Sequence, residues 1–187
     1  MIDLPEVFPI LNTKRLVLRE QDECHIPQMV TLANTEDVAK MLSSMPYPYT
    51  RKDAKAWIKK ARQEYMQKVL ISFAITDKEI QKYMGTVDMM LSPEHNHATL
   101  AYWLGRPYWG KGFMSESVVA VIHYGFDVLG LRRIASHHFH TNPASGRVME
   151  KAGMKREGIR RAHFKKGEEY LDVHDWGILR EEFIPNR

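Results

Sequence analysis

The segment from Gly105 to Met114 contains the residues of this sequence whose types and spacing most directly indicate chemistry. It reads Gly-Arg-Pro-Tyr-Trp-Gly-Lys-Gly-Phe-Met and lies between a strand-like run and an amphipathic run that predicts a helix. Glycine lets a ligand approach the backbone closely, and N–H groups at the start of a helix lie at the positive end of its dipole. A phosphate is stabilised there without a dedicated charged pocket. The segment therefore predicts an anion-binding turn.

Two alternatives to this interpretation come from the same residues. Four residues separate Gly105 from Gly110, and Lys111 follows, as in the Walker A loop of nucleotide triphosphatases. That pattern then fails, because Gly112 stands where Ser or Thr would hold Mg²⁺. The second alternative is a loop whose glycines only form a tight turn before a helix. This segment alone does not distinguish an anion-binding turn from a plain tight turn, so the rest of the sequence is needed.

Composition predicts an ordinary globular protein. The chain has 187 residues, of which 44% are hydrophobic and 27% charged, and it has no low-complexity stretch, so we expect a single domain over residues 1–187. The net charge of +4 clusters in residues 51–62 and 155–166, which suits partners that carry phosphate or carboxylate groups. No zinc-finger spacing or aromatic-rich binding motif supports nucleic-acid binding.

The sequence also indicates a compartment. The first residues lack the basic start and apolar stretch of a signal peptide, and no run reaches membrane-spanning length. We therefore expect a cytoplasmic protein with no membrane partner. The single cysteine, Cys24, excludes an internal disulfide framework. The oligomeric state is left open, with a homodimer as one option.

The elements that must position the glycine turn alternate along the chain. The first third predicts a strand over Arg15–Glu20, a helix from His25 or Pro27 to Leu32, and a short helix capped by Asn34. Thr50 and Asp53 then resemble a capping box. The helix that follows has an apolar stripe of Ala54, Trp57, Ile58, Ala61 and Tyr65.

The remaining two thirds predict strands and two further helices. The strands cover residues 70–76, 83–91, 98–104, 133–139, 154–164 and 171–179. The first three suggest an antiparallel meander that leads into the glycine turn. A helix follows over residues 112–129, and a second has Asn142 as N-cap and Pro143 at its first position. Together these elements predict an α/β (α+β) fold.

Several motifs in this order resemble the GNAT superfamily of acetyl-CoA-dependent N-acetyltransferases, in particular the RimJ/RimL branch of ribosomal-protein Nα-acetyltransferase-like enzymes. The motifs are Ala101-Tyr102-Trp103-Leu104, Tyr108-Trp109-Gly110-Lys111-Gly112-Phe113-Met114-Ser115-Glu116, Asn142-Pro143-Ala144-Ser145, Val148-Met149-Glu150-Lys151-Ala152-Gly153-Met154 and Glu157-Gly158. The resemblance covers nearly the whole chain. Trp109 departs from the general signature, where Arg or Gln is usual, and Met114 stands where a small residue is usual.

The resemblance implies a fold and a cofactor site. The fold is a mixed, mostly antiparallel sheet of six to seven strands flanked by about four helices. Acetyl-CoA is the co-substrate, held between two separating strands, with its pyrophosphate on the backbone N–H groups of the glycine turn and with Lys111 close enough to add charge. The implied cofactor-binding residues are Trp103, Leu104, Trp109, Gly110, Lys111, Gly112, Phe113, Met114, Asn142 and Ser145.

The resemblance also implies catalytic residues. Asn142 and Ser145 are placed beside the thioester, with Ser145 donating a proton to the sulfur. Capping of the helix alone would explain both residue types. His163 stands where a RimL-type enzyme carries a glutamate, and an imidazole with an ordinary pKa near 6.5 is able to accept a proton at neutral pH. A histidine on a basic hairpin surface is the alternative interpretation.

Two histidine pairs suggest metal binding, but only weakly. His138 and His140 are two residues apart, and so are His95 and His97. Two ligands do not make a site, and no third is placed by the sequence. We therefore predict no metal.

The chemistry favours one class of acceptor. A free α-amino group has a pKa about 2.5 units below that of a lysine side chain, so it is presented neutral at a cost lower by about 3.4 kcal/mol. We therefore expect an N-acetyltransferase that acetylates the N-terminal α-amine of a protein or peptide by direct transfer. A small-molecule amine is the alternative acceptor. A silent CoA-binding or nucleic-acid-associated module is the alternative of a different class.

Overall fold

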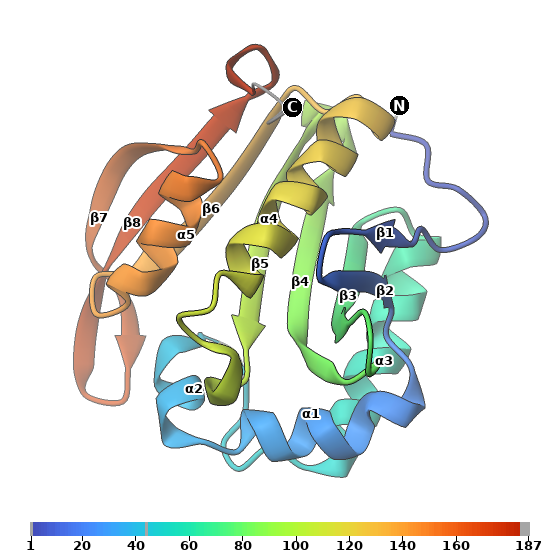
Figure 1. Cartoon of the computed structure of the whole chain (residues 1–187). Helices are drawn as coiled ribbons and strands as arrows, with labels where there is room; N and C mark the ends of the chain where they lie inside the picture. The colour runs from blue at the N-terminus through green and yellow to red at the C-terminus, as the bar shows by residue number, and fades with distance from the viewer. Residues whose placement is uncertain (1, 44, 184–187) are drawn as a thin grey trace.

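One mixed sheet organises the chain. The computed structural model describes residues 2–43 and 45–183. Its eight strands follow the order β1-β2-β3-β4-β5-β6-β8-β7, and every neighbouring pair is antiparallel except β5 with β6 (Figure 1). The strands are β1 Leu11–Asn12, β2 Leu16–Glu20, β3 Leu70–Asp77, β4 Tyr83–Ser92, β5 His97–Leu104, β6 Arg133–Phe139, β7 Lys155–Lys166 and β8 Glu169–Leu179.

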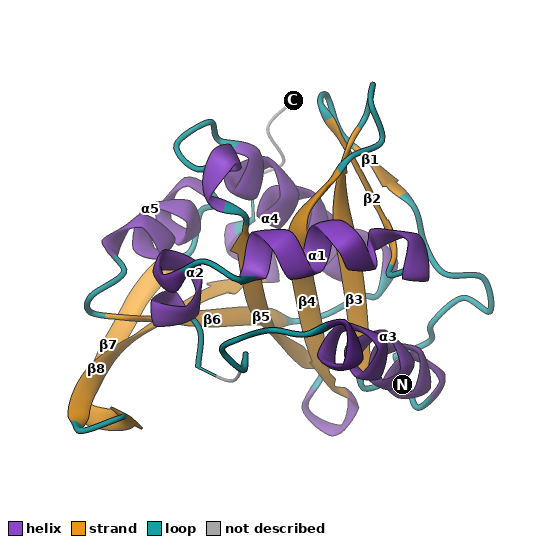
Figure 2. Cartoon of the chain, turned by 90° about the horizontal axis from the view of Figure 1, so that it is seen from below, coloured by secondary structure: helices purple, strands orange, loops and turns teal. Residues whose placement is uncertain are grey.

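Five α-helices of the described residues surround the sheet. They are α1 Ile26–Ala33, α2 Glu36–Met41, α3 Arg51–Met66, α4 Phe113–His123 and α5 Pro143–Lys151. Figure 2 shows α3 and α4 on opposite faces of the sheet, with α1 across the ends of its central strands. The predicted mixed, mostly antiparallel fold is confirmed. In the described part of the chain, the sheet has eight strands rather than six or seven, and it is flanked by five helices rather than about four. The unpredicted strand is β1, whose two residues are too few to show a period.

Two apolar clusters lie on the two faces of the sheet. The larger packs α4 against the central strands, and the smaller packs α1 and α3 against β3 and β4. Phe73, Val118 and Ile122 are fully buried in the first, and Tyr83 is fully buried in the second. Burial of one such aliphatic or aromatic side chain contributes about 1.5–3 kcal/mol. The central strands are therefore covered by apolar packing on both faces.

The helix starts test the predicted caps. Thr50 and Asp53 form the predicted capping box, with the Thr50 N–H donating to Asp53 Oδ2 over 2.8 Å. The prediction of Asn34 as a cap is wrong, because Thr35 Oγ1 accepts from the Val38 N–H and begins α2. The Asn34 amide instead pairs with the backbone N–H and carbonyl of Tyr49, at 2.6 and 2.5 Å. An amide that pairs with a distant extended segment is not available to cap its own helix.

The predicted helix over residues 112–129 changes form near its end. It is α-helical over Phe113–His123 and π-helical over Tyr124–Val128. Gly125 lies in the wider turn, where a Cβ atom would come within 2.8 Å of Ile134 Cδ1 on β6. The wider turn and the glycine together allow the helix to pack closely on the sheet.

The parting of β5 from β6 is the feature of the fold that creates a site. The two strands pair only from His97 with Arg133 to Leu100 with Ser136. There the buried Ser136 hydroxyl donates to the Leu100 carbonyl over 2.9 Å. Beyond that contact β5 continues beside β4 to Leu104, whereas β6 continues beside β8. Residues 101–104 of β5 thus have a strand partner on one side only.

Candidate active site

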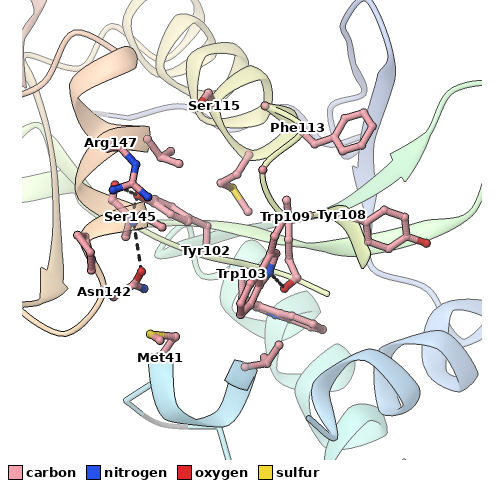
Figure 3. A pocket seen from close by; sticks show the side chains of 18 of the residues that line it. Met41, Tyr102, Trp103, Tyr108, Trp109, Phe113, Ser115, Asn142, Ser145 and Arg147 are labelled. Carbon is pink, nitrogen blue, oxygen red and sulfur yellow. Dashed lines mark hydrogen bonds between the residues drawn. The ribbon is translucent and has the colours of Figure 1, made fainter. Parts of the chain in front are cut away.

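A cavity of about 380 Å³ opens where β5 has lost its second partner. Its walls come from the end of β5, the turn before α4, the first turns of α5 and the end of α2 (Figure 3). The labelled lining residues are Met41, Tyr102, Trp103, Tyr108, Trp109, Phe113, Ser115, Asn142, Ser145 and Arg147. The sequence-predicted turn and the start of α5 therefore lie on one cavity.

Alternate residues of β5 direct their backbone groups toward this cavity. The Gly105 N–H donates to Met84 of β4, whereas the Leu100 carbonyl accepts from the β6 side. Because successive strand residues direct their backbone groups to opposite sides, Trp103 faces β4, and Tyr102 and Leu104 face the gap. The Leu104 carbonyl there accepts from the Trp109 indole over 2.7 Å. Trp103 lines the cavity, but Tyr102 is the residue whose backbone N–H and carbonyl are directed into it.

The glycine turn presents a row of backbone donors. Gly110 and Gly112 have φ of 72° and 79°, a left-handed conformation that favours glycine. The helix begins at Phe113 with no side chain capping its N–H groups, and its first bond runs from the Glu116 N–H to the Gly112 carbonyl. Within the described part of the chain, no N–H group of residues 110–115 donates to a protein acceptor. Such a row at a helix N-terminus is suited to a diphosphate.

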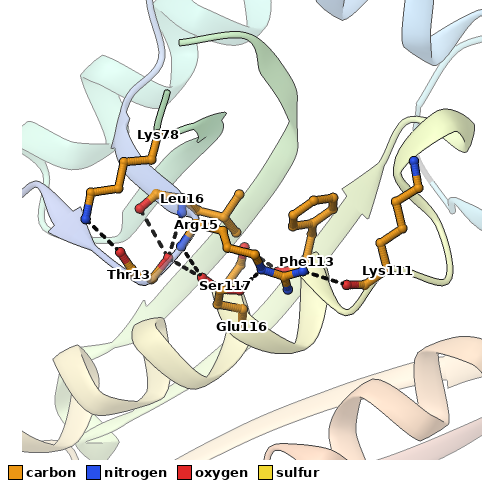
Figure 4. A network of polar contacts seen from close by, with 8 residues as sticks. All are labelled: Thr13, Arg15, Leu16, Lys78, Lys111, Phe113, Glu116 and Ser117. Atoms are coloured by element: carbon orange, nitrogen blue, oxygen red, sulfur yellow. Dashed lines mark hydrogen bonds and ion pairs between the residues drawn. The ribbon is translucent and has the colours of Figure 1, made fainter. Parts of the chain in front are cut away.

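A polar network fixes this turn from the outside (Figure 4). Glu116 accepts from Thr13 Oγ1 at 2.6 Å and from Arg15 Nε at 2.7 Å, and the Arg15 guanidinium lies 4.3 Å from the Phe113 ring centroid. Arg15 also donates to the Lys111 carbonyl at 3.0 Å. Desolvation alone would raise the pKa of Glu116, but the hydrogen bonds from Thr13 and Arg15 hold it below its usual value. Glu116 is thus an ionised structural partner of the turn.

Two residues of the turn need separate description. The Lys111 ammonium donates to the Pro107 carbonyl over 2.8 Å, and Lys111 is not among the residues that line the cavity. Met114 is buried in the main core, although it also contributes to the cavity wall. The bulk of Met114 is therefore directed into the apolar interior and leaves the backbone donors uncovered.

The opposite wall is the start of α5. Asn142 caps this helix as predicted, with its Oδ1 accepting from the Ser145 N–H at 3.3 Å. The Ser145 hydroxyl lies 2.9 Å from the Tyr102 hydroxyl. Burial raises the pKa of Tyr102, and this outweighs the opposing effect of its hydrogen bond with Ser145, so the phenol stays protonated. This contact joins residues 43 positions apart, so no local pattern in the sequence indicates it.

The same wall carries positive charge that the sequence analysis missed. Arg147 and Lys151 both line the cavity, and their spacing of four residues places them on one side of α5. The sequence feature that indicates them is a pair of basic residues four positions apart within a helix that begins with a proline. These cations face the row of N–H donors on α4, so an anionic ligand meets positive potential from both walls.

A smaller cavity of about 90 Å³ adjoins the first and shares Tyr102 and Ser145 with it. His137 lines it and also lines a larger hollow of about 450 Å³. Asp175 lies opposite His137 on β8 and accepts two bonds of 2.8 Å from Arg160. His137 is more than a third exposed, yet desolvation of its ring and the Arg160 guanidinium lower its pKa against the opposing effect of Asp175. The imidazole is therefore neutral at pH 7.

The three sequence-predicted catalytic residues are not all brought together. Asn142 and Ser145 lie side by side on the cavity wall. His163 is exposed on β7, where its Nε2 contacts the Arg160 guanidinium, and it lines neither of the two adjoining cavities. The role of His163 stays a prediction.

The other titratable candidates are engaged in the fold. Buried His138 bonds the Phe139 carbonyl through Nδ1, and His140 Nδ1 accepts from the Asp172 N–H. Across residues 2–43 and 45–183, no three His, Cys, Asp or Glu side chains are grouped as metal ligands would be. Desolvation raises the pKa of Asp88 to about 7, but this carboxylate accepts from Ser72 and lines neither cavity. In the described part of the chain, no helix has both the length and the apolar character needed to span a bilayer.

Comparison with known proteins identifies the architecture. A family model described as "Acetyltransferase (GNAT) domain" matches residues 15–155. The chain is 31% identical to the uncharacterised N-acetyltransferase YnaD of Bacillus subtilis (strain 168), covering 92% of this chain and 98% of the relative. It is 28% identical to YoaA of the same organism, covering 93% and 98%. Its fold is similar to that of RimL, a ribosomal L7/L12 α-N-protein acetyltransferase solved with coenzyme A, with a TM-score of 0.82, 21% identity and coverage of 91% and 98%.

The cavity suits the co-substrate of this family. Coenzyme A offers a diphosphate, which the uncapped N–H row of α4 would bind, and an extended amide arm, which the unpaired edge of β5 would bind. Arg147 and Lys151, which also line the cavity, would supply charge for its remaining phosphate. The residues that line the cavity therefore fit acetyl-CoA.

Substitution of Gly112 tests the turn. Gly112→Ala forces a side chain into a left-handed conformation and shifts the N–H row, so we expect the Kd for acetyl-CoA to rise by about tenfold or more. Calorimetry measures it. The matched control is Gly167→Ala, which has a similar φ of 62° on a distant hairpin and should leave acetyl-CoA affinity unchanged. Equal affinity losses in the two variants would contradict the assignment.

Proposed function

The chain belongs to the acetyltransferase (GNAT) family and is an acetyl-CoA-dependent N-acetyltransferase, and from that premise we propose that its acceptor is the N-terminal α-amine of a protein or peptide. The observation that carries the proposal is the weak basicity of the site. Among the described residues, no carboxylate and no imidazole lines the cofactor cavity. The adjoining small cavity adds the histidines His137 and His138 but no carboxylate.

A weakly basic site selects an amine that is already partly neutral. An α-amino group has an ordinary pKa of about 7.7–8.0, whereas a lysine side chain has one near 10.4. At pH 7.5 a substantial fraction of the α-amine is therefore neutral without help from the enzyme. A lysine acceptor would need a stronger base than the described residues supply.

The carboxylates near the acceptor side are already paired. Glu157 forms a bidentate pair with Arg133, and Asp175 forms one with Arg160. These pairs line the hollow next to His137. A polycationic small molecule would have to displace an arginine to reach either carboxylate, which disfavours that class of acceptor.

The chain's own groups account for direct transfer. The neutral amine attacks the thioester carbonyl carbon, a C–N bond forms, and the Tyr102 N–H, directed into the gap, would stabilise the oxyanion. When the C–S bond breaks, the sulfur takes the proton of the Ser145 hydroxyl and the Tyr102 hydroxyl at 2.9 Å replaces it, while Tyr102 recovers its proton from the imidazolium formed at His137 when the amine is deprotonated. The proton lost by the amine passes to His137, which is neutral and lines the adjoining cavity.

A panel of acceptors tests the proposed substrate. Thiol release from acetyl-CoA is measured with free-N-terminus peptides, the same peptides with a blocked N-terminus and an internal lysine, and small amines. We expect turnover with the free α-amines and a loss of at least about 100-fold in kcat/KM for the blocked peptides. A higher kcat/KM for lysine or for a small amine would contradict the proposal.

Two histidine variants identify the base. A neutral imidazole accepts a proton only above its own pKa, so kcat should fall as the pH drops through the lowered pKa of His137, below 6.5. We expect His137→Gln to remove this acid limb and lower kcat by about 10- to 100-fold. His163→Gln is the matched variant on β7, which is separated from β6 by β8, and should keep the limb. The reverse result would return the role of base to His163.

A further inference from the structure

Helix α2 is too short to be stable by itself. It has six residues, Glu36–Met41, and an isolated helix of that length is unstable in water. Its start is capped by Thr35, but its end has no glycine, and Leu42 leaves the helix in an extended conformation. The last carbonyls of a helix need partners from elsewhere.

A single ammonium group supplies those partners. Lys166 Nζ donates to the carbonyls of Ala39 at 2.7 Å, Lys40 at 2.8 Å and Leu42 at 2.7 Å. An ammonium group has three N–H donors, so all three are used on the end of α2. The charge also interacts favourably with the negative end of the helix dipole.

Lys166 belongs to the β7–β8 hairpin, which apolar contacts anchor. It is the last residue of β7, more than 120 positions from α2 in the sequence. Its Nζ lies 5.8 Å from the ring centroid of Phe139, and Phe139 packs with Phe164, Leu171 and Val173 in a separate apolar cluster. Partial burial of the ammonium group lowers the pKa of Lys166.

The two ends of α2 face different parts of the site. Near its start, Asp37 pairs at 2.6 Å with Arg106, which lies at the beginning of the glycine turn, and Val38 lines the cofactor cavity but not the smaller one. Past its end, Ser43 lines only the smaller cavity that contains His137. Met41 and Leu42 line both. The hairpin thus holds the C-terminal end of α2, which is the end that lies nearer to the acceptor side of the site.

We propose that Lys166 is a positioning residue for the acceptor: by capping α2 it fixes Met41–Ser43 as a wall of the cavity into which the amine is delivered. The proposal rests on the assignment of that cavity to the acceptor made under the proposed function. The start of α2 keeps its own anchors, Thr35 and Arg106, so loss of the ammonium loosens Met41–Ser43 and leaves in place the N–H row of α4 and the α5 wall, which carry the polar contacts to the cofactor.

The test compares Lys166→Met with Lys165→Met. Methionine keeps an unbranched apolar stem beside Phe139 but donates no hydrogen bond. Lys165 is the neighbouring exposed lysine, whose Nζ lies over the Tyr170 ring and not on α2. For Lys166→Met we expect the KM for the acceptor to rise about tenfold, with kcat and the Kd for acetyl-CoA changed by less than about twofold. Lys165→Met should leave all three unchanged.

Amide hydrogen exchange provides a measurement independent of turnover. We expect residues 36–43 to exchange faster in Lys166→Met, with residues 155–179 unaffected. Unchanged exchange in α2, or equal increases in the acceptor KM and the acetyl-CoA Kd, would overturn the proposal. If α-amine peptides are not acetylated, the proposed acceptor fails; the kinetic comparison then uses the amine that does turn over, and the exchange result stands by itself.

Discussion

The loss of pairing between β5 and β6 is the constraint on which the rest of the site depends. Four residue pairs hold the two strands together, and the Ser136 hydroxyl donates a hydrogen bond to the Leu100 carbonyl where the pairing ends. An unpaired strand edge inside a protein would ordinarily be costly, because each backbone N–H and carbonyl needs a partner. In this fold the exposed edge at Tyr102 and Leu104 is where an extended amide-containing ligand would complete the sheet.

The two helices beside the gap make it selective for an anionic ligand. Helix α4 begins without a side-chain cap, so its first N–H groups stay available, while Arg15 and Glu116 hold the turn from outside the cavity. Helix α5 begins with a cap and contributes a hydroxyl and cations instead. The Ser145–Tyr102 contact links the α5 wall to β5 across the opening. The N–H groups suited to a diphosphate are thus carried on α4, whereas the paired hydroxyls are carried on α5 and β5.

Local signals explain which features the sequence could predict. Gly110 and Gly112 mark the turn because their backbone conformation favours glycine, and Thr50 with Asp53 marks a helix start because both partners lie within one turn. Contacts between distant segments escaped prediction. Asn34 pairs with Tyr49 rather than capping α2, and neither the Tyr102–Ser145 contact nor the Lys166 cap has a local pattern. His137 was missed because its significance depends on where β6 leaves β5.

The central claim is that the backbone of the turn and of the unpaired strand edge binds coenzyme A. Titration of the ¹⁵N-labelled protein with coenzyme A, followed through its amide resonances, tests it most directly. We expect the amide resonances of residues 110–115 and of Tyr102 to shift and saturate together, while those of the β7–β8 hairpin tip stay in place. Saturable binding that leaves the amides of residues 110–115 and Tyr102 unmoved would contradict it.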